Sequence, residues 1–111
     1  MMPRDVNPQG TIFGGVLLSL IDQGAFVEAL RQAPRRFVTV SFKQVEFHRP
    51  VLVGDVLSLW AESTRIGRTS ITVRVRVLAQ REGEPQDINV TEAEVTLVSV
   101  DDQGRPTPIL E

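Results

Sequence analysis

The sequence predicts an α+β domain in which one long helix is followed by an antiparallel sheet. Two observations lead to this prediction. Residues 14–32 are apolar on nearly every side of a helical wheel, whereas residues 36–100 alternate apolar and polar residues between turn signals. A helix that precedes consecutive strands is typical of the α+β class. Because the chain has 111 residues and no internal repeat, we expect one domain spanning residues 1–111.

The expected helix begins at Gly14-Gly15, directly after a turn, and ends near Gln32 because Pro34 disfavours helical backbone in the residue before it. Its side chains leave no broad polar face: Val16, Leu17, Leu18, Leu20, Ile21, Ala25, Phe26, Val27, Ala29 and Leu30. It lacks the roughly 20 unbroken apolar residues of a membrane span. We therefore expect a helix buried at the centre of the core.

Asp22, Gln23 and Glu28 interrupt this apolar helix, and the carboxylate of Asp22 is the candidate for function. An acid in apolar surroundings is costly to ionise without a partner, so Asp22 is neutralised, paired or functional. A carboxylate that simply finds a partner at the edge of the core is the alternative to a functional one. At the helix start, Gly14 and Gly15 would let a ligand approach bare backbone N–H groups at the positive end of the helix dipole. Close packing of the helix start against a strand is the alternative there.

Four strands are expected after the helix, over residues 36–47, 56–65, 69–79 and 88–100. In the first strand we expect an inward row that changes phase at a bulge near Lys43-Gln44; the row comprises Val38, Val40, Phe42, Val45 and Phe47. The third strand alternates most clearly and directs Arg74 and Arg76 away from the core. That face would meet solvent or a partner.

Composition excludes several classes of function. Hydrophobic residues make up 41% and charged residues 23%, which is an ordinary globular balance. A net charge of -2 provides no general attraction to nucleic acid or to a membrane surface. The absence of cysteine rules out disulfides, thiolate catalysis and zinc–sulfur sites, and a single histidine, His48, rules out multi-histidine metal sites. We expect no metal cofactor, no signal peptide and a cytoplasmic location.

Taken in order, several motifs resemble the hot-dog-fold acyl-CoA thioesterases, in particular the bacterial cytosolic acyl-CoA hydrolases. The motifs cover nearly the whole chain: residues 2–10 leading into Phe13-Gly14-Gly15, Ile21-Asp22, Phe47–Pro50, Val53–Asp55, Gly67–Ser70, Thr91–Ala93 and Val100–Pro106. The resemblance implies a sheet curled around one central helix, homodimers that join their sheets, and hexamers built as trimers of dimers. It also implies a strand ahead of the helix, which we expect to be missing from this sequence.

The implied activity is hydrolysis of an acyl-CoA to a free acid and CoA, with no separate cofactor because CoA is part of the substrate. The resemblance assigns the chemistry to Asp22 and Asn7 and places Gly14 and Gly15 at the reacting carbonyl. Asn7 could also be a plain turn residue, as Asn-Pro often is. Thr11 and Phe13 stand where some relatives carry other residues, and we expect both at the substrate entrance.

The segment Gly67-Arg68-Thr69-Ser70 resembles the turn that meets the CoA phosphates in relatives. An arginine, two hydroxyls and exposed backbone suit a phosphate, although a plain hairpin turn explains the same residues. Arg49 is a further candidate for contact with the substrate, and a solvated surface residue is the alternative. His48 has no serine or aspartate at a recognisable triad spacing, so we interpret it as structural or surface.

The spacing within the helix has a consequence for the site. Gly15 and Asp22 are separated by roughly 10 Å along a helix axis, so one reacting carbon cannot easily contact both within one subunit. Antiparallel helices across a two-fold axis would bring Asp22 of one chain beside Gly15 of the other, giving two shared sites per dimer. Asp22 would act as a general base or as a nucleophile. The alternatives are a non-catalytic acyl-CoA sensor and an acyl-thioester hydratase or dehydratase.

Overall fold

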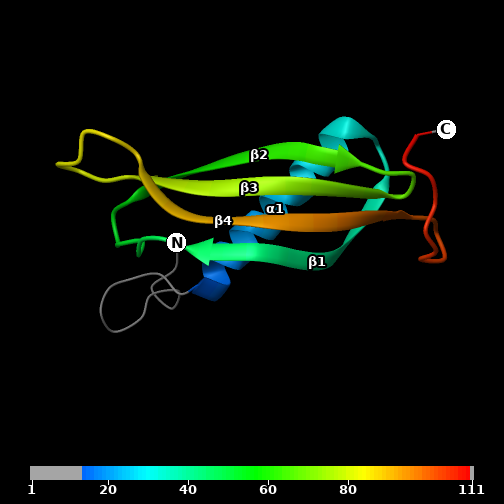
Figure 1. Ribbon diagram of the computed structural model, residues 1–111, viewed down its shortest axis with the longest axis horizontal. Helices are drawn as coiled ribbons and strands as arrows, with labels where there is room; N and C mark the ends of the chain where they lie inside the picture. The colour runs from blue at the N-terminus through cyan, green and yellow to red at the C-terminus, as the bar shows by residue number, and fades with distance from the viewer. Residues whose placement is uncertain (1–13, 111) are drawn as a thin grey trace.

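The computed structural model describes residues 14–110, which form one helix and four strands (Figure 1). The elements are α1 (Gly14–Gln32), β1 (Arg36–Phe47), β2 (Val56–Ile66), β3 (Ser70–Gln80) and β4 (Ile88–Val100). Each element agrees with its predicted segment to within one residue at either end. The prediction of an α+β fold is therefore confirmed.

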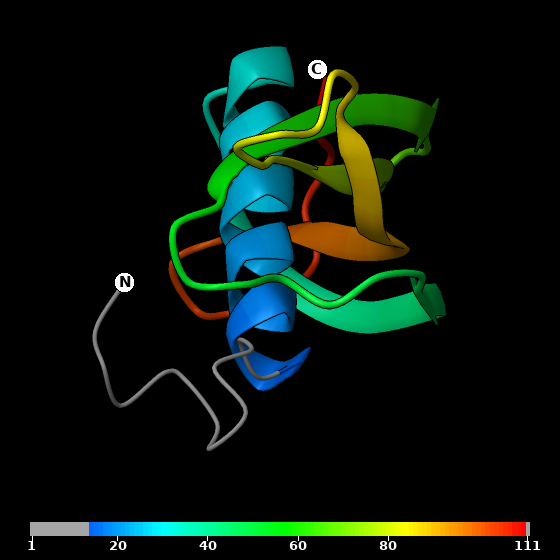
Figure 2. The ribbon, with the colours of Figure 1, turned by 90° about the vertical axis from the view of Figure 1, so that its left-hand side faces the viewer.

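The four strands form one antiparallel sheet in the order β1-β4-β3-β2. Helix α1 crosses one face of this sheet diagonally, from the β1 edge to the β2 edge (Figure 1), and contacts every strand. Viewed from the side, the helix forms one layer and the sheet the other (Figure 2). Among the described residues, no helix combines the length and hydropathy that crossing a membrane requires.

The core lies between α1 and the middle of the sheet. The helix-facing row of β3 is completely buried, and it pairs with a buried row on β4. These rows comprise Ile71, Val73, Val75, Val77 and Ala79 on β3, and Ala93, Val95 and Leu97 on β4. Helix α1 contributes Leu17, Ile21, Ala25 and Ala29 from the opposite side. Burial of each large aliphatic side chain stabilises the fold by about 1.5–3 kcal/mol.

The prediction that α1 is buried on all sides is wrong for the single chain. Phe26, Val27 and Leu30 remain 42%, 64% and 41% exposed. The reason is geometric, because a single sheet layer covers only the side of the helix that faces it. Within residues 14–110, the far side of α1 is an apolar surface without a covering strand.

The predicted inward row of β1 is only partly right, because the register places Phe42 and Phe47 on the helix-facing side but Val38 on the other, and none of the row is buried. All five of its side chains are more than a third exposed. Val38 pairs with Val98 and therefore lies on the face away from α1, while its neighbour Phe37 is buried. As an edge strand, β1 has β4 on one side only, and the helix covers little of it.

Two irregularities in β1 explain the altered phase. The register shifts between Thr39 and Ser41, so that Phe42 lies opposite Val95 on the helix-facing side. It shifts again between Lys43 and Glu46, where Gln44 adopts a φ of 53°. The second irregularity confirms the predicted bulge near Lys43-Gln44. The first was not predicted, because apolar and polar residues alternate regularly through Thr39 and Ser41 in the sequence.

Candidate active site

Asp22 is held by a hydroxyl from the neighbouring edge strand. The Thr39 Oγ1 atom donates a hydrogen bond of 2.6 Å to Asp22 Oδ1. Thr39 lies opposite Leu97, so its side chain shares the helix-facing side of the sheet. Sequence reasoning missed Thr39, although a lone hydroxyl between the apolar residues Val38 and Val40 was an available signal. The hydrogen bond orients the half-buried carboxylate.

An open hollow of about 580 Å³ lies beside this carboxylate, between α1 and β1. Its walls are mainly apolar, and they comprise Asp22, Gln23, Phe26, Val27, Phe37, Val38 and Thr39. A site of this kind offers a surface to a carbon chain and one oriented acid to a polar reacting group. Asp22 therefore has both a hydrogen-bond partner and an adjacent hollow. A functional carboxylate requires this arrangement, and an acid that faced only bulk solvent would lack it.

The start of α1 provides backbone donors. Gly14 is the first helical residue, and the first-turn N–H groups of a helix have no intrahelical acceptors. A Cβ atom added at Gly15 would meet no described atom within 4 Å. Close packing against residues 14–110 therefore does not explain a glycine at this position. The open space instead suits the approach of a ligand to the positive end of the helix dipole.

Helix α1 carries a second carboxylate, Glu28, for which the sequence predicted no role. Its side chain is 6% exposed and accepts hydrogen bonds from Arg31 Nε at 2.8 Å, Gln32 Nε2 at 2.9 Å and Ser63 Oγ at 2.7 Å. The hydrogen bond from Arg31 lowers the pKa of Glu28 to about 2, although burial opposes the shift. Because Ser63 belongs to β2, this ionised group ties the helix to the β2 edge.

The turn from Gly67 to Ser70 connects β2 and β3, and its backbone supports other segments. Gly67 N donates to Ser70 O, Ser99 N to Thr69 O, and Ile109 N to Arg68 O, each at 2.8 Å. The hairpin interpretation is therefore confirmed for the backbone. The side chain of Arg68 stays exposed, so contact with a phosphate remains a prediction for this turn.

The other predicted site residues lie elsewhere or outside the described range. Arg49 follows β1 at the opposite end of the sheet from the Gly67–Ser70 turn. The strand register separates the two by roughly seven residues of β4, or about 24 Å. A single chain does not bring them together. Asn7, Thr11 and Phe13 lie outside the described residues.

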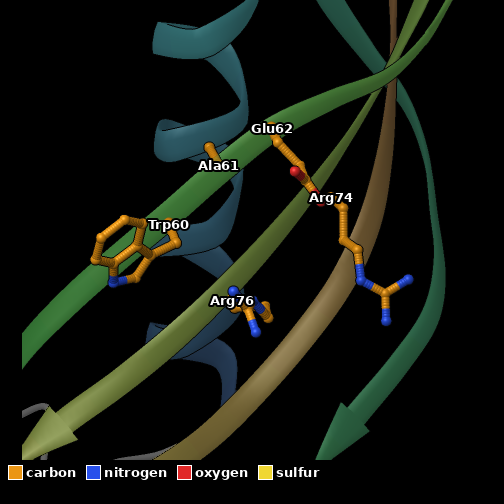
Figure 3. A pocket seen from close by; sticks show the side chains of 5 residues that line it. All are labelled: Trp60, Ala61, Glu62, Arg74 and Arg76. Atoms are coloured by element: carbon orange, nitrogen blue, oxygen red, sulfur yellow. The ribbon is translucent and has the colours of Figure 1, made fainter. Parts of the chain in front are cut away.

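The face of the sheet away from α1 is strongly charged. Arg74 and Arg76 lie on it, as predicted, and Arg74 Nη2 forms an ion pair of 3.1 Å with Glu92 Oε2. Trp60, Ala61 and Glu62 of β2 complete a small cavity with these arginines (Figure 3). Its volume of about 70 Å³ equals that of a few water molecules. The helix side, with its hollow of about 580 Å³, therefore offers more room for a substrate than this face.

Comparison with known proteins supports one family. Residues 9–86 match the model of the Thioesterase superfamily. The chain is 40% identical over 111 residues to the acyl-CoA thioester hydrolase YciA of Salmonella typhimurium, covering 97% of this chain and 84% of the relative. It resembles a hexameric hotdog fold thioesterase of Campylobacter jejuni, with 45% identity, a TM-score of 0.89, and coverage of 98% and 84%.

A third relative is an acyl-CoA hydrolase of Staphylococcus aureus, solved in complex with butyryl coenzyme A and coenzyme A. The identity is 30% and the TM-score 0.89, with coverage of 98% of this chain and 66% of that one. These similarities extend over nearly the whole chain. They agree with the helix-on-sheet architecture and identify it as a hotdog fold.

Proposed function

This chain belongs to the thioesterase superfamily, in its hotdog-fold group of acyl-CoA hydrolases, and we propose from this premise that Asp22 is the acid that hydrolyses its acyl-CoA thioester to a free carboxylic acid and CoA. The observation that carries the proposal is the Thr39–Asp22 hydrogen bond at the wall of an apolar hollow. A relative that binds butyryl coenzyme A supports the class of substrate.

Asp22 acts on the thioester carbonyl carbon in one of two ways. As a general base it takes a proton from water while the water oxygen attacks that carbon. As a nucleophile it attacks directly and forms a mixed anhydride, which water then hydrolyses. In both routes the carbon–sulfur bond breaks, and CoA leaves as the thiolate and takes up a proton. Within residues 14–110, Thr39 is the only hydrogen-bond partner of the Asp22 side chain, so the second carboxylate oxygen is available for this step.

The amides of Gly14 and Gly15 polarise the carbonyl oxygen, aided by the helix dipole. Because Gly15 lies roughly 10 Å from Asp22 along the helix axis, these amides come from the second subunit of a homodimer. The exposed apolar side of α1 and the exposed side chains of β1 support such a dimer. Three dimers would then form a hexamer like that of the Campylobacter relative.

The remaining predicted residues serve binding. Asn7 holds the attacking water or the carbonyl, while Thr11 and Phe13 shape the entrance. Arg68, Thr69 and Ser70 contact the CoA phosphates. Arg49 lies at the other end of the sheet from the Gly67–Ser70 turn. A substrate bound at this turn would therefore contact the Arg49 of a different chain.

The decisive experiment compares wild type with Asp22→Asn on a panel of acyl-CoA substrates, with a thiol reagent to detect released CoA. We expect kcat to fall by about 10²–10⁴-fold, because the carboxamide accepts no proton. Calorimetry should show that CoA binding survives. Asp102→Asn, in an exposed turn, is the matched control and should be fully active. Unchanged thiol release in Asp22→Asn would refute the proposal.

The same assay separates the other functions considered for this fold. Tight acyl-CoA binding by wild type without thiol release would identify a sensor. A hydratase would pair its acid with a histidine, yet His48 follows the end of β1 remote from Thr39. Oxygen-18 water in a single turnover distinguishes the two routes, because label enters the Asp22 carboxylate only through an anhydride.

A further inference from the structure

Two glutamates face each other on the charged side of the sheet. Glu46 of β1 and Glu92 of β4 are directly paired in the register. Like charges at directly opposed positions destabilise a sheet, so a cation close to both carboxylates would stabilise this pairing. Arg74 supplies one cation to Glu92, but it binds Oε2 and leaves Oε1 on the other side of the carboxylate.

His48 completes a set of three candidate ligands. Its Nε2 atom lies 3.5 Å from Glu46 Oε2 and 3.6 Å from Glu92 Oε1. These separations exceed the 2.7–3.2 Å range of N–H···O hydrogen bonds. They are close to the edge of a tetrahedron around zinc, which is about 3.4 Å for bonds of about 2.1 Å. All three donor atoms lie within 4.8 Å of one another.

The backbone holds the three residues in place. The bulge at Gln44 returns Glu46 to a position opposite Glu92, and Thr91 Oγ1 donates a hydrogen bond of 2.6 Å to the Glu46 carbonyl oxygen. His48 N donates to Val90 O at 2.7 Å. Two ligands on paired strands, and a third whose backbone is hydrogen-bonded to β4, lose little conformational freedom when a metal binds.

We propose that Glu46, His48 and Glu92 bind one divalent transition-metal ion per chain, with Zn²⁺ the best match to one imidazole and two carboxylates. Water completes the coordination. The ion joins the bulged end of β1 to β4. It lies about 17 Å along β4 from the Asp22–Thr39 pair and on the opposite face of the sheet. Within one chain the ion is therefore separate from the acid that acts on the thioester, and the inference does not rest on the proposed function.

The test is calorimetric titration of chelator-treated, full-length protein with Zn²⁺ alone. We expect one ion per chain and a higher melting temperature in its presence. His48→Ala and Glu46→Gln should each weaken Zn²⁺ binding by at least about 10–100-fold. Removing a residue that only supports a metal ligand already costs that much, and these variants remove a ligand itself. Glu94→Gln, on the same strand and face, is the matched control and should bind like wild type.

Two further measurements address the geometry. Co²⁺ bound in place of zinc should give the visible absorption of a low-symmetry, near-tetrahedral site, and His48→Ala should abolish it. Arg74→Gln should tighten Zn²⁺ binding, because it removes a positive charge from Glu92. Failure to bind Zn²⁺, or equal binding by wild type and His48→Ala, would overturn the inference and leave the histidine as an ordinary ion-pair partner of the two glutamates. Equal weakening by Glu94→Gln would overturn it as well, by indicating diffuse attraction to surface acids.

Discussion

Strands β3 and β1 are both long and rich in valine, yet their apolar side chains have opposite environments. The helix-facing residues of β3 are fully buried, whereas Val38, Val40 and Phe42 of β1 are 43%, 55% and 39% exposed. Strand β3 lies between two neighbours beneath α1, while β1 is an edge with one neighbour. The core is therefore complete on the β3 side of the molecule. On the β1 side it ends in an apolar surface suited to a partner chain.

The largest effect in this comparison is expected when a side chain is removed from the buried core beneath α1. Leu97→Ala, at a fully buried position in β4, should lower the free energy of unfolding by about 2–5 kcal/mol. Val40→Ala on β1 is the matched truncation and should cost less than about 1 kcal/mol in the isolated chain. Urea denaturation at low protein concentration measures both. Equal losses would show that β1 is as well packed as the core.

The next effect concerns the ionised cluster that ties α1 to β2. Glu28→Gln should lower the free energy of unfolding by about 1–3 kcal/mol at pH 7, because it removes charge-assisted hydrogen bonds from a buried group. The pKa of Glu28 is lowered from 4.5 to about 2, so its stabilisation is fully present above pH 4.5 and is lost as the pH falls toward 2.

Urea unfolding of wild type and variant across this pH range should therefore give curves that converge near pH 2. The exposed Glu82→Gln is the control and should follow wild type. A gap between the Glu28→Gln and wild-type curves that is the same at every pH would contradict an ionised Glu28.

A smaller effect is expected at the start of the helix, where stability and activity should move in opposite directions. Gly15→Ala should raise the free energy of unfolding by about 0.5–1 kcal/mol, because alanine favours helix and its methyl group meets no described neighbour. Thiol release should nevertheless slow, since the methyl group occupies the space in which the carbonyl approaches. A stable variant with wild-type kcat and KM would remove Gly15 from the site.

The smallest change in the stability of the chain itself is expected on the β1 surface. Val40→Lys should alter the free energy of unfolding of the monomer by no more than about 0.5 kcal/mol, because the side chain is already exposed. A lysine on an edge strand opposes association, so light scattering should show smaller particles than wild type. Ser58→Lys, on the outer face of β2, provides the comparison. Unchanged particle size in Val40→Lys would separate β1 from the oligomer interface.

The sequence predicted the bounds of every element because turn residues and periodicity are local signals. The phase of β1 was not predictable in the same way. Val38, Val40 and Phe42 alternate regularly along the chain, but the register break between Thr39 and Ser41 turns Phe42 to the face opposite Val38. The apolar pattern of the helix also did not predict that one side of α1 remains exposed in the single chain.

The site was predictable where chemistry contrasts with its surroundings. Asp22 stands out as an acid in an apolar helix, whereas Thr39 lies 17 residues away and meets it only through the fold. Glu28 was interpreted only as an interruption of the helix, because its partner Ser63 lies on a distant strand and meets it only through the fold. The roles of Asn7, Thr11 and Phe13 remain predictions from the family resemblance.

The two register breaks in β1 also limit how the molecule can polymerise. A flat apolar edge would accept one extended strand after another and promote fibres. The breaks between Thr39 and Ser41 and between Lys43 and Glu46 increase the local twist of this edge. A foreign strand then matches only part of its length, while a copy with complementary curvature fits throughout. We therefore expect self-association through this edge to favour a closed assembly over fibres.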